Sequence, residues 1–112
     1  MAETYKKLGH ELVEGSPATA TMYTVPALTS AIVKHIRLTN VDTGNACHVK
    51  IYHRDDGESA NTGSQILPQI SIRAGGWGEF EGTIIMEALD FLYIETQATD
   101  DINYVVYGME LT

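Results

Sequence analysis

The feature that most constrains the fold of this chain is the spacing of its turn residues. Segments rich in Val, Ile, Tyr and Thr recur about every 8 to 15 residues, with Gly, Asp, Asn or Pro between them. Within the segments, apolar and polar residues alternate with a period of two, the pattern of a strand with one buried face. The predicted strands are Tyr5–Leu12, Thr19–Val25, Ala31–Asn40, Cys47–His53, Gln65–Ile72, Trp77–Thr83, Phe91–Thr96 and Ile102–Leu111.

The alternation sorts the side chains of each strand onto two faces, of which one is expected to be buried. In Ala31–Asn40 it places on one face Ile32, Ile36 and Leu38, and on the other Val33, His35, Arg37 and Thr39. In the last strand it separates two faces of four residues each, namely Ile102, Tyr104, Val106 and Gly108, and Asn103, Val105, Tyr107 and Met109. Pro68 predicts an edge strand or a bulge, because proline cannot donate to a sheet ladder.

A chain of 112 residues has room for one hydrophobic core. We therefore expect an all-β fold, a single antiparallel β-sandwich that is jelly-roll-like, with seven or eight strands over residues 1–112. Within it, residues 1–9 are expected to form a docking arm or an edge strand. Thr83–Leu89 shows a weak helical period, but it is shorter than a typical helix.

The charge of the chain excludes some partners. The sequence holds 15 acidic and 7 basic residues, for a net charge of −8. Nucleic-acid binding needs clustered Lys and Arg, so we expect no nucleic-acid partner. No apolar run is long enough for a signal peptide or a membrane span, so we expect synthesis in a cytoplasm-like compartment and no membrane partner.

Metal and cofactor motifs are weak in this sequence. The four histidines are His10, His35, His48 and His53, and none forms the H-x-H pair that a strand would need to offer two ligands on one face. The acidic segments Asp55–Glu58 and Asp100–Asp101 do not match a calcium-loop pattern. We expect no metal site and no cofactor.

Catalytic motifs are weak as well. The chain has no G-x-S-x-G elbow, and its single cysteine, Cys47, is predicted to face the core. Glu79, Glu81 and Glu87 offer carboxylates, but no spacing places two of them across a cleft. The glycine-rich segment Ala74–Gly78 precedes a strand rather than a helix, so it predicts a turn and not a phosphate site. We expect no enzyme activity.

Three segments carry a resemblance. They are Tyr5–Gly9 (YKKLG), Met22–Val33 (MYTVPALTSAIV) and Gly108–Thr112 (GMELT). With these, the chain resembles a widespread group of short tailed-phage proteins, some of them virion components. The chain departs from the group at two turns, where Leu28 and Leu89 stand in place of glycine, and this leaves the shape of both turns open.

The resemblance implies a phage virion structural protein, most directly a capsid decoration or cement protein on the outer capsid surface. Its implied partners are the lattice of the major capsid protein and copies of itself, as a homotrimer. Two groups of residues are predicted to bind the partner. One is the N-terminal segment with its paired cations, and the other is a tryptophan beside a glycine turn: Tyr5, Lys6, Lys7, Leu8 and Trp77.

Other functions remain open at this point. Within the same class, the alternative is a tail, baseplate or fibre-associated protein. A carbohydrate-binding module is a second, since aromatic side chains on a β-sandwich can stack on sugars, and the candidates are Tyr52, Trp77, Tyr93 and Tyr107. A small hydrolase on a jelly-roll scaffold is the third.

Overall fold

In the computed structural model, the described residues are 6–13, 19–57, 64–97 and 101–112. They contain eight strands, namely β1 (Lys6–Leu12), β2 (Thr19–Thr24), β3 (Ser30–Asn40), β4 (Cys47–Arg54), β5 (Gln65–Ile72), β6 (Trp77–Met86), β7 (Phe91–Thr96) and β8 (Ile102–Leu111). The weak helical period at Thr83–Leu89 forms no helix, as its short length led us to expect: β6 continues to Met86 and a short turn follows. A helix long and apolar enough to cross a membrane is absent from these described ranges.

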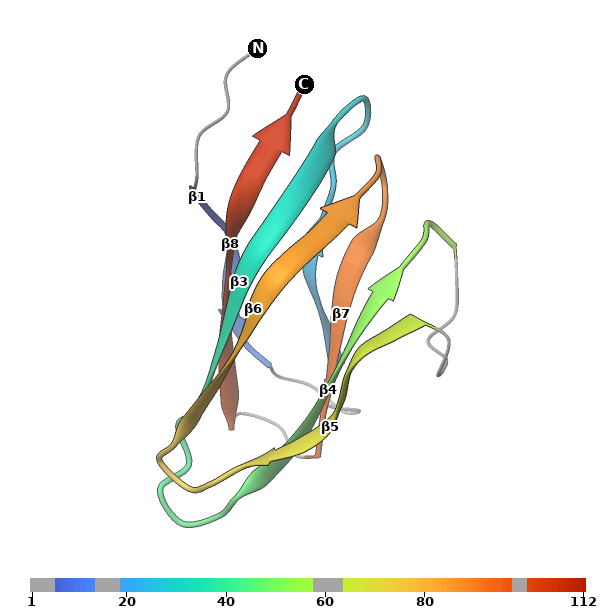
Figure 1. Ribbon diagram of the computed structural model, residues 1–112. Helices are drawn as coiled ribbons and strands as arrows, with labels where there is room; N and C mark the ends of the chain where they lie inside the picture. The colour runs from blue at the N-terminus through green and yellow to red at the C-terminus, as the bar shows by residue number, and fades with distance from the viewer. Residues whose placement is uncertain (1–5, 14–18, 58–63, 98–100) are drawn as a thin grey trace.

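The strands form two antiparallel four-stranded sheets. Their orders are β1-β8-β3-β6 and β2-β7-β4-β5, which we call the first and the second sheet. Figure 1 shows the sheets as two layers, with β8, β3 and β6 in one and β7, β4 and β5 in the other. Neighbouring strands alternate between early and late parts of the chain, which is the arrangement of a jelly roll. The predicted all-β, jelly-roll-like sandwich is confirmed.

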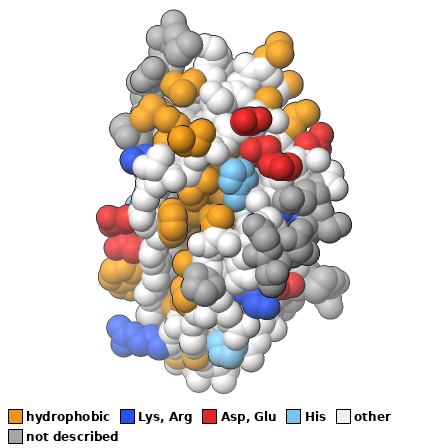
Figure 2. Space-filling view, turned by 45° about the vertical axis from the view of Figure 1, so that its right-hand side comes forward, with side chains coloured by type: hydrophobic (Ala, Val, Ile, Leu, Met, Phe, Trp, Pro, Cys, Tyr) orange, Lys and Arg blue, Asp and Glu red, His pale blue; other side chains and the backbone are white. Residues whose placement is uncertain are grey.

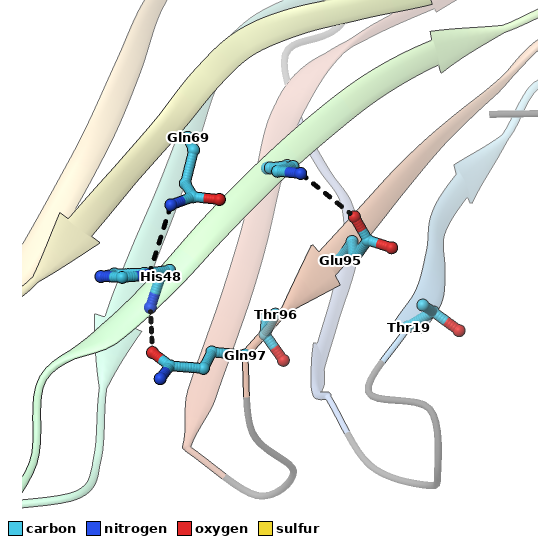
Figure 3. Close-up of a pocket in the computed structure, with 7 residues that line it drawn as sticks. Thr19, His48, Gln69, Glu95, Thr96 and Gln97 are labelled. Carbon is cyan, nitrogen blue, oxygen red and sulfur yellow. Dashed lines mark hydrogen bonds and ion pairs between the residues drawn. The ribbon is translucent and has the colours of Figure 1, made fainter. Parts of the chain in front are cut away.

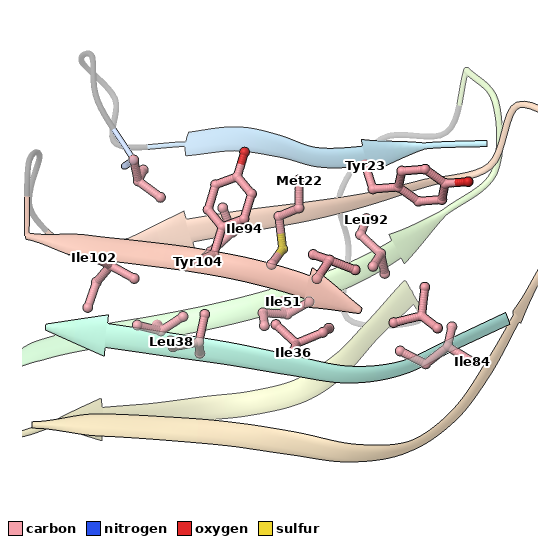
Figure 4. Close-up of a cluster of buried hydrophobic side chains, with 14 of the residues drawn as sticks. Met22, Tyr23, Ile36, Leu38, Ile51, Ile84, Leu92, Ile94, Ile102 and Tyr104 are labelled. Atoms are coloured by element: carbon pink, nitrogen blue, oxygen red, sulfur yellow. The ribbon is translucent and has the colours of Figure 1, made fainter. Parts of the chain in front are cut away.

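The hydrophobic core lies between the two sheets. Leu92 and Ile94 of β7 point toward the layer that contains Ile36 and Leu38 of β3, as Figure 4 shows. These four side chains are at most 1% exposed. Truncating one such side chain to alanine costs about 2–5 kcal/mol of stability. The two alternating sets predicted for the last strand do differ in burial, because Ile102, Tyr104, Val106 and Gly108 are buried and the residues between them are not.

A β-bulge in β3 shifts the alternation. The pairing of β3 with both β6 and β8 changes register between Val33 and His35. One extra residue at this point reverses which side chains face inward. Ile36 and Leu38 are buried as predicted, but the prediction for the first half was wrong: Val33 is buried and Ile32 is only half-buried.

The edge strand β5 carries the predicted irregularity. Pro68 lies in β5, which has β4 as its only neighbour in the second sheet. The register between these strands shifts after the pair Val49 and Ile70, and the next pair is Ile51 with Leu67. The expectation of an edge strand or a bulge at this proline is confirmed, since both are present.

Two leucines adopt a backbone conformation that favours glycine. Leu28, between β2 and β3, has φ 60°, and Leu89, between β6 and β7, has φ 70°. The two turns lie side by side, because the amide of Leu89 donates to the carbonyl of Val25 at 3.0 Å and the amide of Val25 donates to the carbonyl of Asp90 at 2.9 Å. For a residue with a Cβ, this left-handed backbone conformation lowers the stability of the folded state by about 1–2 kcal/mol.

Two glycines allow close backbone contacts. A Cβ on Gly9 of β1 would overlap the carbonyl oxygen of Met22 in β2, and a Cβ on Gly108 of β8 would overlap the carbonyl oxygen of Ile32 in β3. The first contact joins the edges of the two sheets, and the second lies beside the bulge. Both glycines therefore serve packing.

A buried asparagine joins two turns at the other end of the sandwich. Asn40 is 1% exposed, and its Nδ2 donates to the carbonyl oxygens of Asn45 at 2.9 Å, Ile72 at 3.0 Å and Arg73 at 3.2 Å. Its Oδ1 accepts the amide of Asp42 at 3.0 Å. Asn40 thereby bonds backbone groups of the β3–β4 and β5–β6 connections, including the buried carbonyl of Ile72, which needs a partner.

Candidate functional site

The predicted partner-binding residues lie on opposite edges of the first sheet. Lys6, Lys7 and Leu8 belong to the edge strand β1, and Trp77 begins the edge strand β6, with β8 and β3 between them. Tyr5 lies outside the described residues. The structure thus places the described members on one sheet but does not bring them together at one point.

Within β1, the described members have different environments. Lys7 is exposed, whereas Leu8 is partly buried against the core. The Nζ of Lys6 forms an ion pair with Oε1 of Glu110 at 2.8 Å, and the hydroxyl of Tyr23 donates to Oε2 of the same carboxylate at 2.5 Å. The hydrogen bonds from Lys6 and then Tyr23 lower the pKa of Glu110. Burial, followed by the bond to Glu110, raises the pKa of Tyr23 well above its usual range.

On the outer face of the first sheet, two aromatic side chains are each in contact with a neighbouring side chain. The guanidinium of Arg37 lies 4.4 Å from the ring centre of Trp77, whose side chain is 53% exposed. The ring of His35 stacks on Tyr107, with centroids 5.6 Å apart and planes at 19°. Each ring therefore has one face covered by a cationic or aromatic side chain of this chain.

Among the described residues, two clusters combine a histidine with carboxylates. The first cluster is His35 of β3 with Glu79 and Glu81 of β6. Each of these side chains offers one ligand atom, and the three atoms lie within 4.8 Å of one another. In this cluster Nε2 of His35 lies 2.5 Å from Oε2 of Glu79.

The second cluster is His53, Asp55 and Asp90. Oδ2 of Asp90 accepts the amide of Glu87 at 3.0 Å and lies 3.0 Å from Nε2 of His53. Asp90 is also buried, at 8% exposure. These contacts tie the β6–β7 turn to β4, so this cluster has a structural role.

The outer face of the second sheet holds a shallow polar pocket of about 290 Å³. It is lined by Thr19, His48, Lys50, Gln69, Glu95, Thr96 and Gln97. Figure 3 shows Gln69 and Gln97 on either side of His48, with Glu95 across the pocket. Nε2 of Gln69 lies 3.3 Å from Nδ1 of His48, and the His48 amide donates to Oε1 of Gln97 at 3.3 Å. The lining can donate and accept hydrogen bonds, and its one ring is the imidazole of His48.

The four aromatic candidates for sugar stacking are divided between the two sheets. Trp77 and Tyr107 lie on the first sheet, and Tyr52 and Tyr93 on the second. Tyr52 is 7% exposed, and burial, with the Glu95 carboxylate, raises the pKa of its phenol. The ring of Tyr93 lies 4.7 Å from the guanidinium of Arg54. The four residues do not form one stacking platform.

The predicted burial of Cys47 is confirmed. Its side chain has no exposure and packs in the core. A buried thiol in apolar surroundings is a poor nucleophile. Cys47 therefore offers no chemistry at the surface.

Several large apolar side chains are instead exposed. Leu28 is 95% exposed, Ile85 69% and Val41 50%, and Leu89 is 43% exposed. Ile85 pairs with Ile32 on the outer face of the first sheet, near the strained turns. Figure 2 shows one face of the molecule, on which hydrophobic side chains form separate groups, several of them in the upper half near acidic side chains. Exposed apolar groups of this kind give a partner apolar surface to bury.

Among comparisons with known proteins, only the comparison of structures finds similar proteins. No protein-family model matches it, and no curated protein matches its sequence. The structure is similar to a protein from Bacillus endospore appendages, which form disulfide-linked pili, with 16% identity and a TM-score of 0.57 over 98% of this chain and 88% of that chain.

Two further structures are from viruses. The chain is similar to a protein in the acidic stable capsid structure of Helicobacter pylori bacteriophage KHP30, with 11% identity and a TM-score of 0.54 over 100% of this chain and 94% of that chain. A protein of the virus-like particle of the giant freshwater prawn Macrobrachium rosenbergii extra small virus shows 13% identity and a TM-score of 0.53, over 98% of this chain and 78% of that chain. At these identities the likeness establishes a shared jelly-roll fold.

Proposed function

We propose that the chain is a virion structural protein, and specifically a decoration or cement protein on the outer surface of a phage capsid. The observation that carries this proposal is the match to a chain in a bacteriophage capsid structure, which covers 100% of this chain and 94% of that one. The neighbour is therefore a single domain of about this size, and not a large protein with one similar part. The resemblance of three segments to short tailed-phage proteins agrees with this reading.

Surface chemistry supports a binding and assembly role. Exposed apolar groups such as Leu28 and Ile85 supply area that a partner can bury. The net charge of −8 disfavours contact with packaged DNA. The pilus neighbour is described as disulfide-linked. The single cysteine here is Cys47, which is buried, so a disulfide-linked pilus is a weaker analogy.

We further propose a homotrimer that binds the assembled lattice of the major capsid protein. The first sheet has two edge strands, β1 and β6, and unpaired edges favour contact with neighbouring molecules. In this arrangement Lys7 and Trp77 face partners across opposite edges, and residues 1–9 act as the docking arm. Many weak lattice contacts then add up through multivalency.

Immunogold electron microscopy tests the proposed location. Antibodies raised against the recombinant domain are applied to purified particles of the phage that encodes it. Labelling spread over the heads supports the decoration role. If labelling is confined to tail tips, the tail or baseplate alternative replaces the decoration role. If the particles carry no label, a virion role is rejected. Sedimentation velocity of the purified protein tests the trimer, which a monomeric species at 100 µM would contradict.

The polar pocket on the second sheet favours one alternative, a carbohydrate-binding module. His48, Gln69 and Gln97 offer the amide and imidazole groups that bind sugar hydroxyls. The split of the aromatic residues between two faces argues against it. Binding on a glycan array that Gln69→Ala abolishes, in a protein absent from virions, would favour this alternative.

A further inference from the structure

We propose that His35, Glu79 and Glu81 form a binding site for a divalent transition metal ion, with Zn²⁺ as its best-fitting occupant. The site lies on the outer face of the first sheet, and the inference does not depend on the proposed virion role. It departs from the expectation of no metal site. That expectation rested on histidine spacing and on calcium-loop patterns, whereas this cluster combines one histidine with two glutamates from a neighbouring strand.

The strand geometry aligns all three side chains. Glu79 and Glu81 are two residues apart on β6, so they project from the same face of the sheet. His35 lies directly across from Glu81 on β3. A pair at i and i+2 on one strand with a third ligand from the neighbouring strand gives a metal three ligands on a rigid base.

The distances and the donor set fit zinc. The three ligand atoms lie within 4.8 Å of one another. A tetrahedral zinc with bonds of about 2.0–2.1 Å holds its ligands about 3.3 Å apart, so small rotations of the two flexible glutamates complete the site. Imidazole favours zinc, copper and nickel over magnesium and calcium.

Stacking holds the histidine, and the two neighbouring cations of β3 contact other groups, although Arg37 pairs with Glu79 in the strand register. Stacking on Tyr107 fixes the His35 ring while Nε2 faces Glu79. Arg37 and Lys34 are also on β3, but both have other partners. The Arg37 guanidinium lies over Trp77, and the Nζ of Lys34 donates to Oγ1 of Thr83 at 2.7 Å.

Three protein ligands leave the fourth position of a tetrahedral ion open, and here it faces solvent. The side chains of His35 and Glu79 are 29% and 31% exposed, so the site is partly desolvated but reachable. Because the ion joins β3 to the edge strand β6, its binding is expected to stabilise the fold. At a hundredfold excess over the dissociation constant, the expected rise in Tm is roughly 10 °C.

Isothermal titration calorimetry with ZnCl₂ tests the site in the full chain after treatment with chelator. We expect one ion per chain, and at least tenfold weaker binding in His35→Ala and in Glu81→Gln. Both positions are on the outer face, and circular dichroism checks that the variants are folded. The matched control is the double variant His10→Ala with His48→Ala, which removes two exposed histidines outside the cluster and should bind as the original chain does.

Several outcomes would overturn the proposal. These are no binding at 100 µM ZnCl₂, binding that survives in both cluster variants, or binding that the control variant loses. Loss of binding in His53→Ala but not in His35→Ala would move the site to the other cluster and reject this one. Equal binding of Mg²⁺ would show charge attraction only, and would also reject a zinc site.

Discussion

Replacing Leu28 by glycine is expected to stabilise this protein. Leu28 has φ 60°, where the Cβ of any L-residue crowds the following carbonyl oxygen at a cost of about 1–2 kcal/mol. Its side chain is 95% exposed, so its removal gives up almost no buried apolar surface. The strain is thus relieved without a loss of packing.

The gain is partly offset in the unfolded state. Glycine gives the unfolded chain more freedom, which lowers stability by about 0.5–1 kcal/mol. The expected net gain is therefore about 0.5–1 kcal/mol. For a domain of 112 residues this corresponds to a rise in Tm of about 2–6 °C. Leu89 has the same backbone conformation but is only 43% exposed, so Leu89→Gly should gain less.

Thermal and urea unfolding of a matched series measures the effect. Leu28→Ala removes the exposed atoms but keeps the Cβ, so its Tm should stay within about 1 °C of the original. Leu28→Asn should fall between alanine and glycine, because asparagine tolerates the left-handed region. An unchanged urea m-value would show that the unfolded state remains comparably exposed. If glycine is no more stable than alanine, backbone strain at this turn is not the governing effect.

Three other substitutions test the packing and the charges. Asn40→Ala should lower the free energy of unfolding by about 2–4 kcal/mol in urea titrations, because buried carbonyl groups lose their donor. Gly108→Ala should lower it by about 3 kcal/mol or prevent folding, since a Cβ there overlaps the backbone of β3; an unchanged Tm would refute the close contact. Glu110→Gln should cost about 1 kcal/mol at pH 7, where the carboxylate binds Lys6 and Tyr23. Because the pKa of Glu110 is lowered in the folded state, this contribution is present above its unfolded value of 4.5 and is lost as pH falls through the folded value, so the two proteins should converge in stability in acid.

The strands were predictable from the sequence because their signal is local. The alternation in Ile102–Leu111 separated the two faces correctly from Ile102 to Gly108. It failed in the first half of β3, where the bulge depends on pairing with β6 and β8 and so on residues far away in the sequence. The order of the strands within each sheet is likewise a property of the assembled fold.

The candidate sites were harder to predict for the same reason. The pairing of Lys6 with Glu110 joins residues from opposite ends of the chain, and no local pattern announces it. The zinc cluster had one local sign, the Glu79-x-Glu81 spacing in a predicted strand. Its histidine becomes recognisable only once β3 and β6 are known to be neighbours, in the register that places His35 opposite Glu81.

The pairing of β1 with β8 sets when this domain can finish folding. Lys6 lies opposite Gly108, so β1 has no hydrogen-bonded neighbour in its sheet until the last strand has left the ribosome. Folds with such distant partners close slowly, on the order of milliseconds to seconds. During synthesis, the apolar side of β1, with Leu8, and its unpaired edge stay open to other chains. Rapid, crowded synthesis would therefore favour aggregation through this strand, and slower expression at low temperature should increase the soluble yield.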